Sequence, residues 1–496
     1  MKFTILVLLA FVLLSCSNKN TKETKPNIIF LLADDQRAGT INALGNTEVI
    51  TPNLDKIANE GVTFNNAYLA GAMNGAVCAP SRAMLMTGRS LFNIDPTGNT
   101  IAPEHTTLPK ALANAGYHTF HIGKWHNGKQ AFKNSFTDGS KIFFGGMHSQ
   151  YNVPTYEFNQ EGDYSKEMVN TPSPKHSSEL YADAGVNFIQ NYNSEKPFFL
   201  YLAFQAPHDP REMPKEYLDM YDTANISLPP NFMTEHPFDN GELDIRDEWL
   251  AGYPRTPEEV KANIAAYYAM ITHLDAQIGR VMEAVEKKGL MENTIIVFSA
   301  DNGLAVGQHG LMGKQNLYEH SVHVPLIFKG KGLAKGESRD AMAYLYDIYP
   351  TLCEFAGAEV PSTVKGLSLK PVIDKEVERV RESLFFSYKN FQRAVRKNDW
   401  KLIKYNVGGN TRTQLFNLKA DPFETNDLSA DPLYEAQLNK MNQVLRSQMK
   451  AYNDEADLDK PSWGVPVLPA WKDKVDKETV DHLRELAEKE REMRGF

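Results

Sequence analysis

Short apolar runs recur through the first three quarters of the chain, and patterns typical of helices separate them. An apolar run of about four to eight residues is typical of a strand that is buried on both faces. Helical patterns lie between these runs, for example over residues 107–115 and 260–288. Strands that alternate with helices predict an α/β fold with a large, mostly parallel sheet sandwiched by helices. The predicted strands comprise residues 27–33, 117–122, 197–204, 294–299 and 324–328.

The pattern changes near Ser383, after which alternating strands follow one another without helices between them. This predicts a small antiparallel sheet. A helix over 433–452 is expected to pack on it, and residues 474–494 form a strongly charged helix that we expect to be solvated. We therefore divide the chain into a large domain and a C-terminal subdomain with a tail, residues 26–375 and 376–496. The strands of the small sheet are predicted at residues 384–388, 392–396, 400–405 and 414–418.

The N-terminus is typical of an exported protein. Lys2 precedes an apolar run, residues 3–14, that is too short to span a bilayer and predicts a signal peptide. The run ends in Leu-Leu-Ser before Cys16, which resembles a bacterial lipobox. Residues 1–16 would then be a lipoprotein signal peptide and residues 17–25 a flexible, lysine-rich tether. Ordinary signal peptidase cleavage nearby is the alternative. We expect a protein that is lipid-anchored through Cys16, in the periplasm or on the cell surface.

Composition limits the possible partners. The chain has 496 residues, of which 42% are hydrophobic and 23% charged, as in an ordinary globular protein of more than one domain. The formal net charge of -9 argues against a nucleic-acid partner, which a basic surface would favour. Removal of the signal peptide leaves Cys78 and Cys353 in the folded domains, too few for a disulfide framework. Cys353 is expected to be a buried thiol in a helix that glycine terminates.

Polar residues follow two of the predicted strands directly. Asp34 and Asp35 come after the first strand, and Asp301 and Asn302 come after the strand at 294–299. Because the carboxyl ends of parallel strands meet at one edge of a sheet, these oxygen atoms can converge. Adjacent carboxylates repel one another unless a cation pairs with them. The set suits Ca²⁺, or Mg²⁺, rather than zinc.

The segment Cys78-Ala-Pro-Ser-Arg82, followed by Thr87-Gly88-Arg89, is the most specific motif. Proline near its start and glycine after its end predict a short helix whose positive end faces residue 78. The spacing resembles the signature of the formylglycine-dependent sulfatases. In that family a maturation enzyme oxidises the cysteine to 3-oxoalanine (formylglycine), so the resemblance implies this cofactor at Cys78 and this enzyme as a partner.

Further motifs extend the resemblance over most of the chain, in the family's order. They are Gly123-Lys124-Trp125-His126, Ala206-Pro207-His208 and Gly310-Leu-Met-Gly-Lys314. The resemblance implies an alkaline phosphatase-like fold and a catalytic large domain.

The resemblance also implies a role for each site residue. The metal ligands would be Asp34, Asp35, Asp301 and Asn302, with the modified Cys78. Among the catalytic residues, Arg82 and Lys124 would hold the formylglycine hydrate, Lys314 would contact the sulfate, His208 would protonate the leaving alcohol and His126 would act as the base of the second step. His309 is a candidate substrate or supporting contact.

The expected reaction is hydrolysis of sulfate esters on carbohydrates, such as oligosaccharides from algal polysaccharides or glycosaminoglycans. Two alternatives stay open. One is a phosphonate or phosphate monoester hydrolase of the same superfamily, although phosphatases of this fold often use a second metal where this chain has lysines. The other is a glycan-binding surface lipoprotein, which gives Cys78 no role. The sequence does not identify the glycan or the hydroxyl group that carries the sulfate.

Overall fold

The computed structural model describes residues 24–467, 470–473 and 475–496. The predicted signal peptide, residues 1–16, and most of the predicted tether lie outside the described residues. Within the described part of the chain, no helix combines the length and apolar character needed to cross a membrane.

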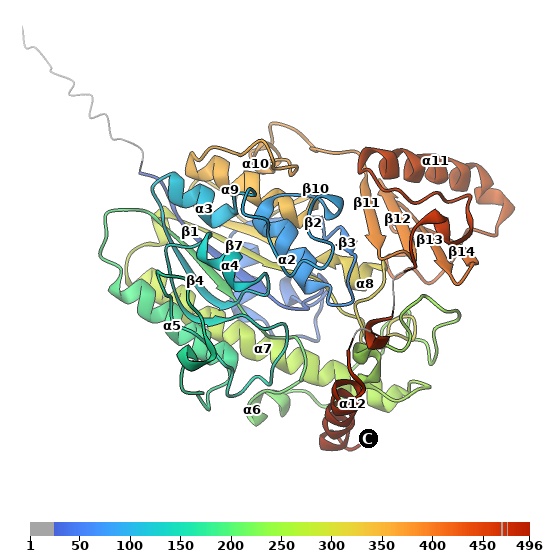
Figure 1. Cartoon of the computed structure of the whole chain (residues 1–496), viewed down its shortest axis with the longest axis horizontal. Coiled ribbons are helices and arrows are strands. Elements are labelled where there is room, and N and C mark those ends of the chain that lie inside the picture. The colour runs from blue at the N-terminus through green and yellow to red at the C-terminus, as the bar shows by residue number, and fades with distance from the viewer. Residues whose placement is uncertain (1–23, 468–469, 474) are drawn as a thin grey trace, which may run out of the picture.

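A large mixed sheet forms the centre of the molecule (Figure 1). Its strand order is β10-β2-β9-β7-β1-β6-β4-β5, with β8 paired to β2. Pairings are parallel throughout β7-β1-β6-β4-β5, whereas β9 is antiparallel to both of its neighbours. The predicted, mostly parallel α/β sheet is therefore confirmed. The strands are β1 (Asn27–Ala33), β2 (Val62–Tyr68), β4 (His118–Lys124), β5 (Asp138–Phe143), β6 (Phe198–Ala203), β7 (Thr294–Ala300), β8 (His323–Val324), β9 (Leu326–Gly330) and β10 (Glu337–Tyr344).

Helices cover both faces of this sheet, with α3 and α9 on one side and α5 and α7 on the other (Figure 1). The two predicted helices are confirmed as α3 and α7. The helices of the large region are α1 (Pro52–Asn59), α2 (Cys78–Thr87), α3 (Leu108–Asn114), α4 (Lys129–Lys133), α5 (Ser177–Asn191), α6 (Lys215–Leu218), α7 (Pro257–Lys287), α8 (Glu319–Val322), α9 (Ile348–Ala356) and α10 (Lys370–Ile373).

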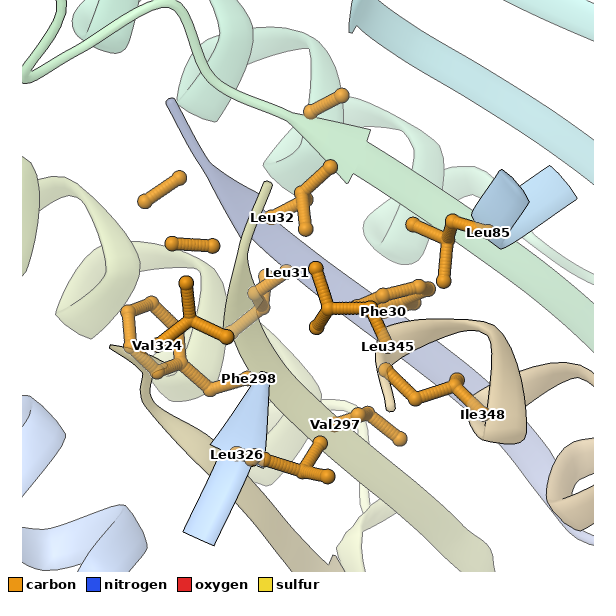
Figure 2. Packing of buried hydrophobic residues seen from close by; sticks show 14 of the residues in the cluster. Phe30, Leu31, Leu32, Leu85, Val297, Phe298, Val324, Leu326, Leu345 and Ile348 are labelled. Atoms are coloured by element: carbon orange, nitrogen blue, oxygen red, sulfur yellow. The ribbon is translucent and has the colours of Figure 1, made fainter. Parts of the chain in front are cut away.

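The core lies where the central strands meet these helices. Figure 2 shows Phe30 of β1 and Val297 of β7 near Leu85 of α2 and Ile348 of α9. All four side chains are buried, which explains why both strands read as continuous apolar runs. Packing on this core holds α2, and therefore Cys78 at its start, above the sheet.

The predicted small antiparallel sheet is also confirmed, in the order β14-β13-β12-β11-β3. Its strands are β11 (Leu384–Tyr388), β12 (Gln392–Lys397), β13 (Trp400–Val407) and β14 (Asn410–Asn417), and α11 (Glu435–Ala451) packs on it through Met441 and Leu445. The pattern did not predict β3 (Gly71–Ala72), which pairs parallel to β11. A strand of two residues is too short to show an alternating pattern in the sequence. The domain boundary at 376 stays a prediction.

The charged C-terminal helix α12 (Lys477–Met493) is exposed over most of its length but is also anchored to the large region. Glu490 is buried and its carboxylate accepts a hydrogen bond from the backbone of Arg211. Arg491 pairs with Glu259 of α7 at 2.8 Å. The expectation of a solvated helix therefore agrees with most of α12 but not with its C-terminal end, which polar contacts dock on the large region.

Candidate functional site

The carboxyl ends of four neighbouring strands, β7-β1-β6-β4, bring the predicted side chains together. Residues 34–35 follow β1 and residues 301–302 follow β7. Lys124 is the last residue of β4, and His208 lies in the segment after β6. Because these strands are parallel and adjacent, one edge of the sheet carries all of these groups.

Three carboxylates form the centre of the site. Oxygen atoms of Asp34, Asp35 and Asp301 lie within 4.8 Å of one another, and all three residues are buried. The backbone at Asp35 is left-handed, with φ at 66°, a conformation that is costly for a residue other than glycine. The amide of Asn302 donates to Asp35 Oδ1 at 2.7 Å. Two oxygens of the cluster, Asp34 Oδ1 and Asn302 Oδ1, are buried without a hydrogen-bond partner in the protein.

Three cationic side chains surround the carboxylates. Arg82 bridges two of them, at 2.9 Å from Asp34 and 2.8 Å from Asp301. Lys124 Nζ lies 2.5 Å from Asp34, and Lys314 Nζ lies 2.6 and 2.8 Å from the two oxygens of Asp35. Burial alone would raise the pKa of Asp34, but the charges of Lys124 and Arg82 hold it well below its usual range. The buried charges therefore balance only as a network, so removal of one leaves others unpaired.

Cys78 begins helix α2, whose ten residues are all buried. Its sulfur lies 3.6 Å from Lys124 Nζ and 3.4 Å from His126 Nδ1, and within 4.8 Å of Asp34 and His208. Burial raises the pKa of the Cys78 thiol to about 11, although Lys124 acts in the opposite direction. The side chain of residue 78 thus faces the carboxylates, the lysine and both histidines at the positive end of a helix.

A close backbone contact fixes the start of α2. Gly98 has φ at 69°, and a Cβ there would lie 2.2 Å from the backbone nitrogen of Pro80. Asn127 donates to the carbonyl groups of Ala79 at 2.9 Å and Gly98 at 2.6 Å. No side chain fits between these two segments.

We therefore expect Gly98→Ala to lower the free energy of unfolding by about 1–3 kcal/mol, through overpacking and backbone strain together. Thermal unfolding measures the effect. Gly116→Ala is the matched control, because Gly116 also has a positive φ, 95°, but open space around it. If both variants lose the same stability, the contact between Gly98 and α2 is unimportant.

The two histidines approach the site from different strands. His126 is left-handed, with φ at 72°, and burial together with Lys124 and Arg82 lowers its pKa well below the usual value. His208 Nδ1 lies 2.7 Å from the carbonyl oxygen of Asp209. Since a carbonyl group only accepts, Nδ1 carries the hydrogen, and Nε2 faces the cluster at 3.7 Å from Asp35.

Several residues that lie next to His208 and Lys314 were not predicted from the sequence. Asp209 is buried and pairs with Arg246, which also pairs with Asp247 at 2.5 Å. Asp247 accepts from Gln315 at 2.7 Å. Adjacency to His208 was the one available signal for Asp209, and nothing in the sequence linked the segment around residue 246 to this site. These contacts hold the segments that carry His208 and Lys314.

His309 is not part of this cluster. Its ring stacks on Tyr318 with centroids 3.9 Å apart, and its Nε2 contacts Asn231 at 3.1 Å. His309 therefore lies with Tyr318 and Asn231, outside the carboxylate cluster.

The site fits a hard divalent cation. The donors are three carboxylates and one amide oxygen, and two of these oxygens have no partner in the protein. Oxygen ligands of this type suit Ca²⁺ or Mg²⁺. A ligand that accepts hydrogen bonds and carries negative charge would meet Lys124, Lys314 and Arg82 next to this cation.

Comparisons with known protein families agree with this arrangement. The sulfatase family model matches residues 26–358, and the model for the C-terminal part of N-sulphoglucosamine sulphohydrolase matches residues 307–451. An N-acetylglucosamine-6-O-sulfatase from Bacteroides thetaiotaomicron is 30% identical over 524 aligned residues, covering 91% of each chain.

Solved structures show the same fold. One in complex with its substrate D-glucosamine-2-N,6-O-disulfate has a TM-score of 0.74 at 26% identity, covering 89% of this chain and all of that one. The phosphonate monoester hydrolase of Agrobacterium radiobacter has a TM-score of 0.68 at 20% identity, covering 86% of this chain and 96% of the other. This second similarity shows the fold alone. The expected alkaline phosphatase-like architecture is thus confirmed.

Proposed function

Because this chain belongs to the sulfatase family, we propose that it removes sulfate from a sulfated saccharide, using one divalent metal and a formylglycine made from Cys78. Its reaction class is hydrolysis of a sulfate ester, in which water and the ester give an alcohol and free sulfate. The observation that supports the site best is the convergence of Cys78, three carboxylates and three cations at one edge of the sheet.

Asp34, Asp35, Asp301 and Asn302 would hold the metal, with the oxygen of the modified residue 78 beside them. When present, the metal and the hydrated formylglycine supply positive charge at the sulfate and a hydroxyl nucleophile. In the structure the sulfur of Cys78 occupies the place of that oxygen. Ca²⁺ is the preferred ion of this proposal, with Mg²⁺ as the alternative.

The protein's own cations would bind the sulfate group. Lys124 and Lys314 are buried beside Cys78 and Asp35, so their charges act in a medium of low dielectric constant. Arg82 is held by Asp34 and Asp301 and positions both carboxylates. His126, 3.4 Å from Cys78, is placed to accept a proton from the side chain at residue 78.

His208 is placed to protonate the leaving alcohol. Its Nδ1–H is held by the Asp209 carbonyl, so Nε2 can carry a second proton toward the substrate. Asp209 and Arg246 act as positioning residues for this ring.

We expect His208→Ala to slow hydrolysis of sugar sulfates by roughly 10²–10⁴-fold, but to slow an activated aryl sulfate much less. The reason is that general acid catalysis matters most when the departing oxygen is strongly basic. Steady-state kcat/KM on both substrate types measures this. Equal losses on the two substrates would remove His208 from the role.

The proposed substrate class is taken from the substrates that related sulfatases act on or bind. Among the relatives are an N-acetylglucosamine-6-O-sulfatase, a structure bound to D-glucosamine-2-N,6-O-disulfate and an ulvan-active sulfatase. The sulfatase family model matches residues 26–358, most of the predicted large domain. A phosphonate or phosphate monoester hydrolase is the weaker alternative, since two phosphonate monoester hydrolases are similar to this chain at only 20% and 22% identity. A panel of sulfated oligosaccharides of defined regiochemistry, with a phosphonate monoester as the comparison, tests the assignment. Release of sulfate from none of them would contradict it.

The modification of Cys78 has its own test. We expect the peptide spanning residue 78 to carry the mass of formylglycine after expression with a maturation enzyme. Mass spectrometry distinguishes this from cysteine. Unmodified cysteine after native expression would favour a glycan-binding lipoprotein instead. The proposal also includes export and a lipid anchor at Cys16, which labelling with a lipid precursor tests.

A further inference from the structure

The C-terminal helix α12 contacts two separate segments that carry residues of the site. One is the segment after β6, residues 204–212, which contains His208 and Asp209. The other is the short 3-10 helix η5 (Arg246–Leu250), whose first residue is the ion-pair partner of Asp209. α12 packs directly against η5. The end of α12 therefore contacts the segments that carry both partners of the ion pair next to His208.

Glu490 connects α12 to the first of these segments. Its side chain is buried, and one carboxylate oxygen accepts from the backbone N–H of Arg211 at 3.3 Å. Arg211 lies three residues after His208 and is itself buried. Its guanidinium group donates to Asn263 Oδ1 of α7 at 2.7 Å. The segment is thus fixed close to His208, by α7 through a side chain and by α12 through the backbone.

Arg494 connects α12 to η5. Its guanidinium group donates to the carbonyl oxygen of Leu250, the last residue of η5, at 3.3 Å, and also to Asn263 Oδ1. One amide oxygen therefore accepts from both Arg211 and Arg494. Burial and the charge of Arg211 lower the pKa of Arg494 to about 10, so Arg494 is charged at neutral pH. Glu490, 3.4 Å from Arg494, offsets the repulsion between the two guanidinium groups.

The segment that carries His208 also has contacts outside α12. Gln150 donates to the carbonyl oxygen of His208 at 2.8 Å, and the carboxylate of Glu212 accepts from the backbone of Gln150 at 2.6 Å. These hydrogen bonds do not depend on the C-terminal helix. Loss of the α12 contacts should therefore loosen the position of the His208 ring rather than unfold the segment.

We propose that Glu490 and Arg494 are positioning residues for His208. Glu490 acts through the backbone of Arg211, and Arg494 acts through η5 and its ion pair with Asp209. A misplacement of about 1 Å, caused by a change far from the reacting atoms, can cost roughly 10²-fold in rate. The inference rests on the proposed function, in which His208 protonates the leaving alcohol.

Leaving-group dependence in the full-length protein tests this inference. We expect Glu490→Ala and Arg494→Ala each to lower kcat/KM for a sugar sulfate by about ten-fold, and for an activated aryl sulfate by less than about two-fold. In a His208→Ala background the same substitutions should cause little further loss, because changes that act through one group are not additive. A merely structural role would instead lower the rates on both substrates and add to the effect of His208→Ala.

Amide hydrogen exchange of the same variants, followed by mass spectrometry, measures positioning without catalysis. Peptides covering residues 205–212 and 244–252 should exchange faster in both variants than in the unsubstituted protein. Glu488→Ala is the matched control, since Glu488 is an exposed glutamate on the same helix. It should leave the rates and the exchange unchanged, and thermal unfolding should confirm that each variant is folded.

Unchanged exchange of both peptides in both variants would overturn the inference. So would equal losses of the two variants on sugar and aryl sulfates, if His208→Ala itself distinguishes the two substrates. Failure of the proposed function would be visible separately, as absence of sulfate release by the unsubstituted protein or as equal losses in His208→Ala.

Discussion

The Cys78→Ser protein should release about one leaving group per enzyme molecule and then stop. Serine places a hydroxyl group where the sulfur of Cys78 lies, 3.6 Å from Lys124 Nζ and near His126. The serine oxygen can bond to the sulfur atom of the substrate's sulfate group. At the same time the bond between that sulfur and the sugar oxygen breaks, and the alcohol departs with a proton. A single hydroxyl group cannot then collapse to an aldehyde, so the sulfate stays on the serine.

Two measurements check this expectation. Pre-steady-state release from an aryl sulfate gives the number of turnovers, and mass spectrometry of the peptide containing residue 78 shows a retained sulfate group. Cys78→Ala is the matched control, which should release nothing because no hydroxyl group remains. Sustained turnover by rigorously purified Cys78→Ser protein would eliminate the proposed role of formylglycine, even if the protein is a sulfatase.

Removal of the metal should abolish turnover and also lower the unfolding temperature. Asp34, Asp35 and Asp301 are buried within 4.8 Å of one another, and a bound cation offsets their mutual repulsion. A ligand that binds only the folded protein stabilises it by about 2.7 kcal/mol when present at about 100 times its Kd. Chelation followed by differential scanning calorimetry measures the loss, and readdition of Ca²⁺ or Mg²⁺ should restore both properties.

Asp301→Ala should be at least as damaging as chelation. The substitution removes a ligand and one of the two carboxylates that hold Arg82, at a cost of about 3–5 kcal/mol for a broken buried pair. The unfolding temperature of this variant should no longer respond to added metal. Asp219→Ala, at an exposed carboxylate, is the control and should respond as the unsubstituted protein does. Full activity in a verified metal-free preparation would exclude this metal site.

Much of the fold follows from local patterns. β1 and β7 are buried on both faces, so their sequences are continuous apolar runs with recognisable ends. The polar residues that follow them, Asp34 and Asp301, are found at the predicted edge of the sheet. The orientation of β9 was not predictable in this way, because a buried apolar run is equally compatible with parallel and antiparallel pairing.

The candidate site also combines features that the sequence predicted with contacts that it did not predict. The motif around Cys78 and the order of the later motifs allowed the family and the candidate residues to be identified from the sequence. The positioning roles of Asp209 and Arg246 could not be predicted, since 37 positions separate the two residues. A contact over such a separation depends on how the loops pack, which local periodicity does not encode.

The sequence by itself determined the alternation of strands and helices, the small second sheet and the set of candidate site residues, because each depends on periodicity or on short motifs. Only the tertiary structure decided that Arg82 bridges Asp34 and Asp301 and that β3 joins the small sheet. These are contacts between segments distant along the chain. Their geometry is set by the packing of the whole core, which balances many small contributions at once.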